Sequence, residues 1–436
     1  MQFFKSGAIY AAANFAAAAV PFLLLPLLTR VLRPDEFARV VTFMLVVGLC
    51  QATAGLNVNA ALGVAWFKRT RPELQSLVGT AVLVAIASSL LSASVVALLF
   101  ATLPGVGGGM SPGWGAVAAI AAGANVVLQC RLVLWQSQHK AWQCAVLQIG
   151  VSTLNVGLSL FAVLILQAGD YGRNAAIATS FVIGSVVAVV SMRWSSEIRF
   201  SPQAKDFHHL LSLGLPLIAH SLAGALLSTA DRWVVAIRLD GQQLGVYGAG
   251  AQLGMAMALV ADAFTKAYTP WLYSKLKDPQ PTSRYAAVGA VFISVPGFLL
   301  LAALVGCAIY LLSLLMLGER YQGASQLLPW FMLGGAATGV YVSASAFLFY
   351  EGRAGLLALL TSAAAVCGAC LTWLLVGRFA QQGAAAGYAL TQFILATFAL
   401  VVAIRTVALP WTELRVSLRH ISRLMLNATG EHNRNA

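Results

Sequence analysis

The dominant pattern in this sequence is a series of long apolar segments, separated by short polar connections, that continues to about residue 404. A helix of about 20 apolar residues is long enough to cross the hydrocarbon core of a bilayer. No soluble domain interrupts the series, so the pattern predicts an all-α polytopic membrane protein. Twelve transmembrane helices are expected, at approximately 7–28, 40–64, 77–102, 114–136, 142–167, 175–193, 213–237, 246–270, 286–316, 325–349, 356–376 and 384–404.

The first apolar segment also resembles a signal peptide, because "MQFFKSG" places Lys5 before an Ala-rich run. The run continues to Leu28, however, which is long enough to span a membrane. We therefore expect a retained first helix.

The composition agrees with a membrane protein. Apolar residues make up 59% of the chain and charged residues 9%, against about 25% charged residues in soluble domains. The net charge of +13 comes from scattered basic residues without a basic domain, so binding to nucleic acid is not expected. Cys367 and Cys370 form a CxxC on an apolar helix without a nearby His; buried thiols are expected there, and neither a metal site nor a disulfide framework.

The distribution of Lys and Arg predicts the orientation. With both termini in the cytoplasm, eighteen of the 27 basic residues lie on the cytoplasmic side and seven on the outer side, while Arg232 and Lys266 lie inside spans. This asymmetry follows the positive-inside rule.

The first outer loop, "TRVLRPDEFAR", is the exception to this rule because it carries Arg30, Arg33 and Arg39. One interpretation is that Asp35 and Glu36 partly neutralise the loop. The other is that its cations face the mouth of a cavity. The sequence leaves both open.

Six spans precede the polar link at 194–212 and six follow it, which predicts two six-helix lobes, 1–200 and 201–436. "TRVLRPDEFARV" after span 1 aligns with "IRLDGQQLGVYG" after span 7, as a parallel repeat would. Two such lobes are expected to enclose a central cavity, with binding sites near the membrane midplane.

Span 7 contains "ALLSTADRWVV", in which Asp231 and Arg232 are adjacent. A charge at the centre of a membrane helix costs about 2.5–3.5 kcal/mol on insertion scales. Neighbouring residues on a helix point about 100° apart, so each charge needs a partner or water toward the protein interior. His220 and Asp231 fall on one stripe of this helix, and stripes of this kind line water-filled cavities.

Other spans carry polar residues that could line the same cavity. In span 8, Asp262 and Lys266 are four residues apart and share a face. A cavity with several cations suits an anionic cargo, particularly a pyrophosphate, because guanidinium groups bind phosphate through two parallel hydrogen bonds. The candidate substrate-binding residues are Arg232, Asp231, Lys266, Asp262, His220, Arg30, Arg131, Asn14 and Asn57.

Each candidate also has a structural interpretation. Asp231 and Arg232 could clamp span 7 to a neighbouring helix. Asp262 and Lys266 could form a local pair, with Lys266 reaching toward the membrane interface. His220 could bond a backbone group, and isolated Asn and Gln residues often serve helix packing.

Several ordered motifs resemble one family. They are "LLTRVLRPDEFARV" after span 1, "LGLPLIAHSLAG" opening span 7, "STADRWVVAIRLDGQQLGVYGAGAQL", "AYTPWLY" ending span 8 and "LGERYQGASQLLPWFMLG" joining spans 9 and 10. Together the chain resembles Wzx-type polysaccharide flippases of the multidrug/oligosaccharidyl-lipid/polysaccharide (MOP) superfamily. Arg33 and Ala38 stand where the family pattern usually has Gly, so the turn of the first loop departs from that pattern.

The resemblance implies a non-enzymatic, two-lobed transporter of the bacterial inner membrane that works by alternating access. It would flip undecaprenyl-pyrophosphate-linked oligosaccharide repeat units, for O antigen or exopolysaccharide, while the lipid tail stays in the bilayer. No cofactor is implied. The resemblance does imply coupling to a proton or sodium gradient. Such coupling would give His220, Asp231 or Asp262 a proton-carrying role. The implied partners are membrane lipid, a polysaccharide polymerase and a chain-length regulator, and a monomer is expected.

Three alternatives remain open. A cation-coupled multidrug exporter of the same superfamily would carry an acidic residue in span 1, where this chain has only Asn14. A lipid II flippase is a close relative of the favoured function. A membrane enzyme would need a catalytic site, and we find no phosphate-binding Gly-rich loop, HExxH motif or Ser/His/Asp cluster.

Overall fold

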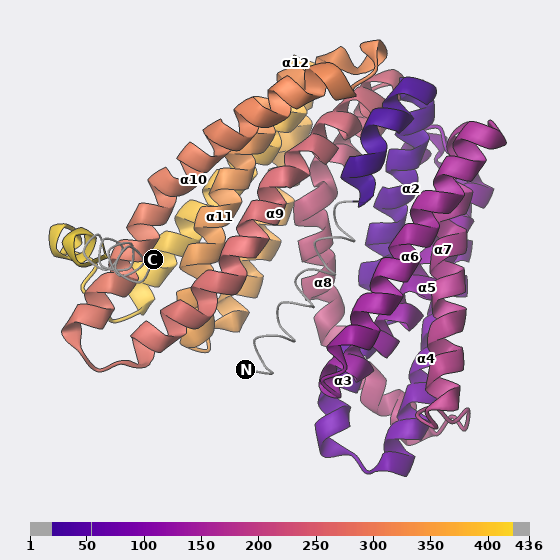
Figure 1. The fold of residues 1–436 in the computed structure, drawn as a ribbon, viewed down its shortest axis with the longest axis horizontal. Helices are drawn as coiled ribbons and strands as arrows, with labels where there is room; N and C mark the ends of the chain where they lie inside the picture. The colour runs from indigo at the N-terminus through magenta and orange to yellow at the C-terminus, as the bar shows by residue number, and fades with distance from the viewer. Residues whose placement is uncertain (1–19, 54, 422–436) are drawn as a thin grey trace, which may run out of the picture. The chain divides into compact units, whose positions relative to one another are not determined.

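The computed structural model describes residues 20–53 and 55–421, apart from the side chains at positions 216 and 220. Every regular element in this part of the chain is a helix, which confirms the predicted all-α class (Figure 1). A short apolar helix, Val20–Val31, comes first. It is followed by α2 (Pro34–Thr53), α3 (Val58–Lys68), α4 (Arg71–Thr102), η1 (Pro104–Gly107), α5 (Pro112–Ser137), α6 (Ala141–Leu160), the π-helix η2 (Phe161–Ile165), α7 (Gly169–Trp194), α8 (Ala204–Arg238), α9 (Gly241–Lys277), α10 (Pro281–Met316), η3 (Glu319–Leu327), α11 (Leu328–Tyr350) and α12 (Ala354–Thr406).

Many of these helices could cross a membrane. By length and composition there are nine among the described residues, or ten when the bent helix α8 counts as one span. The polytopic class is therefore confirmed. The predicted first span, 7–28, lies mostly outside the described residues, so the count of twelve stays a prediction.

Helix α12 contains two predicted spans, 356–376 and 384–404. The chain turns at Ala380, whose φ of 47° is not helical. The two halves then pack against each other in antiparallel fashion: a Cβ placed on Gly383 would lie 2.2 Å from the Leu375 carbonyl oxygen, and one on Gly387 would lie 2.5 Å from Thr372 Oγ1. Glycine is needed at both positions because the helices approach so closely.

The chain forms two compact units. Unit 1 comprises Met1–Ala249 with Met316–Ala324, and unit 2 comprises Gly250–Leu315 with Ser325–Ala436. Helix α8 follows the predicted lobe boundary at residue 200 and packs on α2, α3 and α4 within unit 1. The two repeat-related lobes 1–200 and 201–436 stay a prediction.

Helix α5 lies at the centre of unit 1, in contact with α2, α3, α4 and α7. Its packing face is made of small residues, with Ala118, Ala119 and Ala122 fully buried. A Cβ on Gly123 would lie 2.3 Å from Ser89 of α4. Close backbone approach of this kind is the usual basis of helix packing in membranes.

In unit 2, glycines of α11 receive large side chains from two neighbouring helices. A Cβ on Gly335 would lie 2.4 Å from Met257 of α9, and one on Gly339 would lie 2.4 Å from Phe298 of α10. Phe298 also packs edge-on against Phe264 of α9, with ring centroids 5.0 Å apart. These contacts join α9, α10 and α11.

The predicted span 40–64 lies within one candidate span, Pro34–Lys68, which contains a break between α2 and α3. Helix α2 ends at Thr53, and the φ angles of Gly55, Leu56 and Asn57 are 78°, 51° and 52°. A non-glycine residue in the left-handed region costs about 1–2 kcal/mol. The backbone here is stabilised from outside the helix: the Gly55 N–H donates a hydrogen bond to Ser88 Oγ of α4 at 2.8 Å.

The predicted span 213–237 is also interrupted. Helix α8 bends by 42° between Ala204–Leu215 and Leu217–Arg238, where the sequence has Pro216, which removes a backbone donor from the helix. The bend lies beside the break between α2 and α3, since a Cβ on Gly214 would lie 1.9 Å from the Leu56 carbonyl oxygen.

Candidate functional site

The two adjacent charges of α8 have different environments. The Asp231 side chain is 3% exposed, and Tyr247 of α9 donates a hydrogen bond from its hydroxyl to Asp231 Oδ2 at 2.7 Å. Oδ1 is buried without a hydrogen-bond partner among the described residues. Tyr247 itself is fully buried. This contact ties α8 to α9 and fits the helix-clamp interpretation of Asp231.

Arg232 makes weaker polar contacts than Asp231. Its Nε lies 4.0 Å from Asp231 Oδ2, and its side chain is 24% exposed. That Nε is buried without a hydrogen-bond partner within the described ranges. Since a separation of 4.0 Å is too long for a hydrogen bond, the guanidinium retains capacity to bind an oxyanion.

Asp262 and Lys266 form the local pair that the sequence allowed. Lys266 Nζ lies 2.5 Å from Asp262 Oδ2, both on α9 in unit 2. The side chains are 43% and 58% exposed for Lys266 and Asp262. An additional role in substrate binding stays a prediction.

Arg131 lies in a closed polar cluster at the end of α5. Its side chain is 1% exposed and forms an ion pair with Glu197, and Nη2 donates to Ser195 Oγ at 3.2 Å. Its guanidinium also lies 4.1 Å from the ring centre of Trp135, at cation–π distance. These contacts give Arg131 an evident packing role; a role in the cavity stays a prediction.

Asn57 and Arg30 belong to other parts of unit 1. Asn57 is the residue before α3, where its side chain makes no capping hydrogen bond, and its Oδ1 accepts a hydrogen bond from Ser221 of α8 at 3.0 Å. Arg30 is exposed at the end of the helix Val20–Val31. Asn14 and the side chain of His220 lie outside the described residues. The structure thus brings Asp231 beside Arg232, and Asp262 beside Lys266, while Arg131 occupies a separate cluster.

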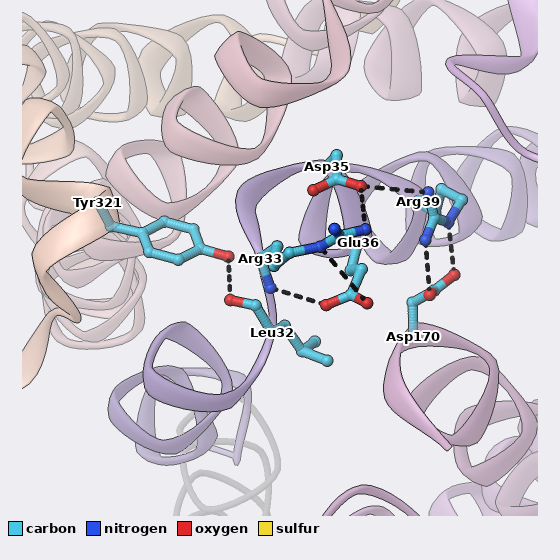
Figure 2. A network of polar contacts seen from close by, with 7 residues as sticks. All are labelled: Leu32, Arg33, Asp35, Glu36, Arg39, Asp170 and Tyr321. Carbon is cyan, nitrogen blue, oxygen red and sulfur yellow. Dashed lines mark hydrogen bonds and ion pairs between the residues drawn. The ribbon is translucent and has the colours of Figure 1, made fainter. Parts of the chain in front are cut away.

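Sequence reasoning missed a polar network at the start of α2, drawn in Figure 2. Arg39 forms two hydrogen bonds with Asp170 of α7, Nε to Oδ2 at 2.7 Å and Nη2 to Oδ1 at 2.9 Å. Asp170 is buried, so this is an inter-helix ion pair with fork geometry. Residues 131 positions apart in sequence give no local signal for such a pair.

The same network supports the first interpretation of the loop between Arg30 and Arg39, while the cavity-mouth interpretation stays a prediction. Arg33 Nη2 lies 3.1 Å from Asp35 Oδ2, and the Arg33 N–H donates to Glu36 Oε2 at 2.8 Å. The two carboxylates therefore neutralise part of the loop, as one interpretation proposed. Figure 2 also shows Tyr321 reaching this loop, where its hydroxyl donates to the Leu32 carbonyl at 3.1 Å.

A second missed ion pair lies at the start of α8. Asp206 is fully buried and accepts hydrogen bonds from Arg69 Nη1 and Ser76 Oγ, both at 2.7 Å. A third missed cluster surrounds Arg173 of α7, which donates to Asn155 Oδ1 at 2.6 Å. These buried polar groups pin the helices of unit 1 to one another.

The sequence of this chain is similar to those of known proteins. Residues 3–275 match the profile of the family described as "Polysaccharide biosynthesis protein". The chain belongs to this family. The match covers more than half of the 436 residues and includes the Asp231–Arg232 pair.

Relatives of this polysaccharide biosynthesis protein include two Haemophilus influenzae proteins. An Lsg locus protein is 24% identical over 372 residues, covering 81% of this chain and 86% of the relative. An uncharacterised membrane protein is 24% identical over 361 residues, covering 81% and 85%.

Solved structures show the same fold. An inward-facing multidrug resistance MATE family transporter of the MOP superfamily has a TM-score of 0.67 at 14% identity, covering 91% of this chain and 94% of its own. The lipid II flippase MurJ, in an inward closed conformation, has a TM-score of 0.66 at 13% identity, covering 96% and 91%. These likenesses show the fold, and the family match over residues 3–275 confirms the relation to polysaccharide proteins drawn from the sequence motifs.

Proposed function

We propose that this polysaccharide biosynthesis protein is a flippase for undecaprenyl-pyrophosphate-linked oligosaccharide repeat units. It moves them from the cytoplasmic to the periplasmic leaflet of the bacterial inner membrane by alternating access. The family match over residues 3–275 carries this proposal. The fold shared with a lipid II flippase and with MATE transporters supports transport rather than catalysis.

The chemistry of α8 supports an anionic cargo. Arg232 is partly exposed, and its Nε has no hydrogen-bond partner in the described part of the chain. An arginine inside a membrane span is costly unless it is paired or faces water, which makes it a candidate for function. A diphosphate supplies several oxygens for its fork of donors. We assign Arg232 to the diphosphate, with Arg30 and Lys266 as further cations near its path.

Coupling to a proton or sodium gradient is part of the proposal, and no cofactor is required. Asp231 suits the role of proton carrier because Tyr247 binds one carboxylate oxygen, while the other has no hydrogen-bond partner among residues 20–53 and 55–421. Asp262 is the second candidate, although Lys266 already neutralises it. His220 is the third. A polysaccharide polymerase and a chain-length regulator are the expected partners of a monomeric flippase.

Two alternatives lead to different phenotypes. A lipid II flippase would be essential for growth. A cation-coupled multidrug exporter would change drug susceptibility and leave surface polysaccharide intact. The predicted first span has Asn14 but no Asp or Glu, whereas such an exporter is expected to carry an acidic residue there.

Complementation tests the proposed function. A strain that lacks its polysaccharide flippase is given this chain, and surface polymer is measured together with the amount of protein in the membrane. Restored polymer supports the proposal. A protein that is present at normal levels, restores no polymer and changes drug susceptibility would instead favour the exporter.

A further inference from the structure

An apolar groove runs along α4 in unit 1, with a volume of about 570 Å³. Its walls include Leu83, Ala87 and Leu91 of α4, Phe207 of α8, and Leu56 in the break between α2 and α3. The lining positions on α4 run from Thr80 to Leu91. At 1.5 Å per residue, this corresponds to a length of about 16 Å. No charged side chain lines the groove.

The groove is located beside the two interrupted helices. Leu56 belongs to the α2–α3 break, and Phe207 belongs to the part of α8 that precedes the bend. A broken helix exposes backbone polar groups, but here the Gly55 N–H is bound by Ser88 Oγ. The space beside the break therefore stays apolar, which suits a hydrocarbon chain rather than a sugar.

One end of the groove is basic. The start of α4 and the link before α8 meet there, since the Arg199 N–H donates to the Gln75 carbonyl at 3.0 Å. Glu73 is held by Thr70, and the buried Asp206 is neutralised by Arg69. Four exposed cations lie around this end, Lys68 at the end of α3, Arg71 at the start of α4, Arg199 in the link and Lys205 in the first turn of α8, together with the exposed carboxylate of Glu73.

We infer that this groove holds part of the hydrocarbon chain of a polyprenyl diphosphate lipid, with the diphosphate at the basic end. The identity of the lipid rests on the proposed function. An apolar groove about 16 Å long accommodates a segment of one chain, and four exposed cations against one exposed carboxylate leave a net positive charge that suits a diphosphate better than the single charge of a typical phospholipid. The groove would hold the lipid while its glycan enters the transport path.

A second groove on another face of α4 provides a matched control. It has a volume of about 330 Å³ and is also apolar, with Ile86, Leu90 and Ala124 among its lining residues. Ala87 lines the first groove and Ala124 the second. The same substitution at these two positions changes an apolar groove on α4 of unit 1 in each case.

The test uses the photoreactive residue p-benzoylphenylalanine at position 87 or position 124 of the full chain, in cells that make the polymer. After irradiation, the mass of the lipid attached to each purified protein is measured. We expect a polyprenyl phosphate or diphosphate adduct at position 87 and none at position 124. Phospholipid adducts alone at position 87, or the same adducts at both positions, would overturn the inference.

Filling the groove gives a second measurement. Ala87→Trp should abolish surface polymer while protein stays at its normal level in the membrane, and Ala124→Trp should leave polymer unchanged. Equal polymer in both variants would contradict the inference. If the unmodified chain complements the flippase-null strain but the protein with the photoreactive residue at position 87 gives no polyprenyl adduct, only the groove assignment fails. If the adduct forms but the chain does not complement, the groove stands and the proposed function fails.

Discussion

Arg39 at the start of α2 and Asp170 at the start of α7 bind each other through two hydrogen bonds of 2.7 and 2.9 Å. The Asp170 side chain is only 4% exposed, so its charge depends on this partner. Burial of a carboxylate is tolerated when it is paired and hydrogen-bonded. The contact therefore joins the start of α2 to the start of α7. Packing of small residues alone would not determine how far one helix is shifted along the other.

Removal of Arg39 should be strongly destabilising. Arg39→Ala leaves Asp170 buried without its partner, which typically costs about 3–5 kcal/mol in free energy of unfolding. Arg33→Ala is the matched control, because Arg33 is 60% exposed and pairs with an exposed carboxylate; about 1 kcal/mol or less is expected there. Reversible unfolding of the purified proteins in detergent measures both. Equal effects would show that the Arg39–Asp170 pair does not stabilise the fold.

The hydroxyl of Tyr247 should stabilise the packing of α8 against α9. Tyr247→Phe keeps the ring but removes the hydrogen bond to Asp231, so the free energy of unfolding should fall by about 1–2 kcal/mol. Tyr273→Phe serves as the control, because Tyr273 has a ring contact with Tyr350 and no hydroxyl hydrogen bond within the described residues. A Tyr247→Phe protein as stable as the control would argue against the clamp between α8 and α9.

Gly318 should be intolerant of a side chain. Its N–H donates to Thr29 Oγ1 at 3.2 Å, and a Cβ at this position would lie 2.2 Å from the Thr29 carbonyl oxygen. Gly318→Ala should therefore push the segment 316–324 away from the helix Val20–Val31. Labelling of a cysteine placed at Tyr321, which is fully buried, would report this as faster reaction.

Gly323 provides the comparison for that experiment. A Cβ at Gly323 would meet only Val246, at 3.4 Å, which is close to ordinary contact. Gly323→Ala should leave the labelling rate near that of the parent cysteine protein. Equal acceleration by the two substitutions would mean that the close approach of Gly318 to Thr29 is not what holds the segment.

Exchanging the charges of Asp262 and Lys266 on α9 distinguishes a purely structural ion pair from a substrate-binding site. The double substitution Asp262→Lys with Lys266→Asp retains the pair at i,i+4 but moves the cation. If Lys266 contacts an anionic cargo, polymer should fall while membrane protein levels stay normal. Full activity of the exchanged protein would assign the pair to structure alone.

The helical, polytopic fold was predictable because apolar segments of membrane-spanning length leave few alternatives. The sequence did not predict the break at Gly55–Asn57, because the left-handed backbone there is stabilised by Ser88, which lies 33 positions away. The bend of α8 was recognisable in principle from Pro216, which lies inside the predicted span.

The candidate site was only partly predictable. The cost of charge in a membrane singled out Asp231 and Arg232, and helical spacing predicted the Asp262–Lys266 pair. Arg131 has the same residue type and a similar position in its span, yet it is enclosed by Glu197 and Trp135. Its partner Glu197 lies 66 positions away, so helical periodicity within a single span could not distinguish this cluster from a cavity-facing cation.

Reconstituted transport with variants of Arg232 is the most direct test of the central claim that this residue serves an anionic lipid-linked cargo. The purified protein is placed in proteoliposomes, and the transfer of a polyprenyl-diphosphate-linked oligosaccharide between leaflets is measured. Flipping should be lost in Arg232→Ala and reduced in Arg232→Lys, which keeps the charge but not the fork of donors, while both proteins remain folded. Flipping by Arg232→Ala at the rate of the unmodified protein would contradict the claim.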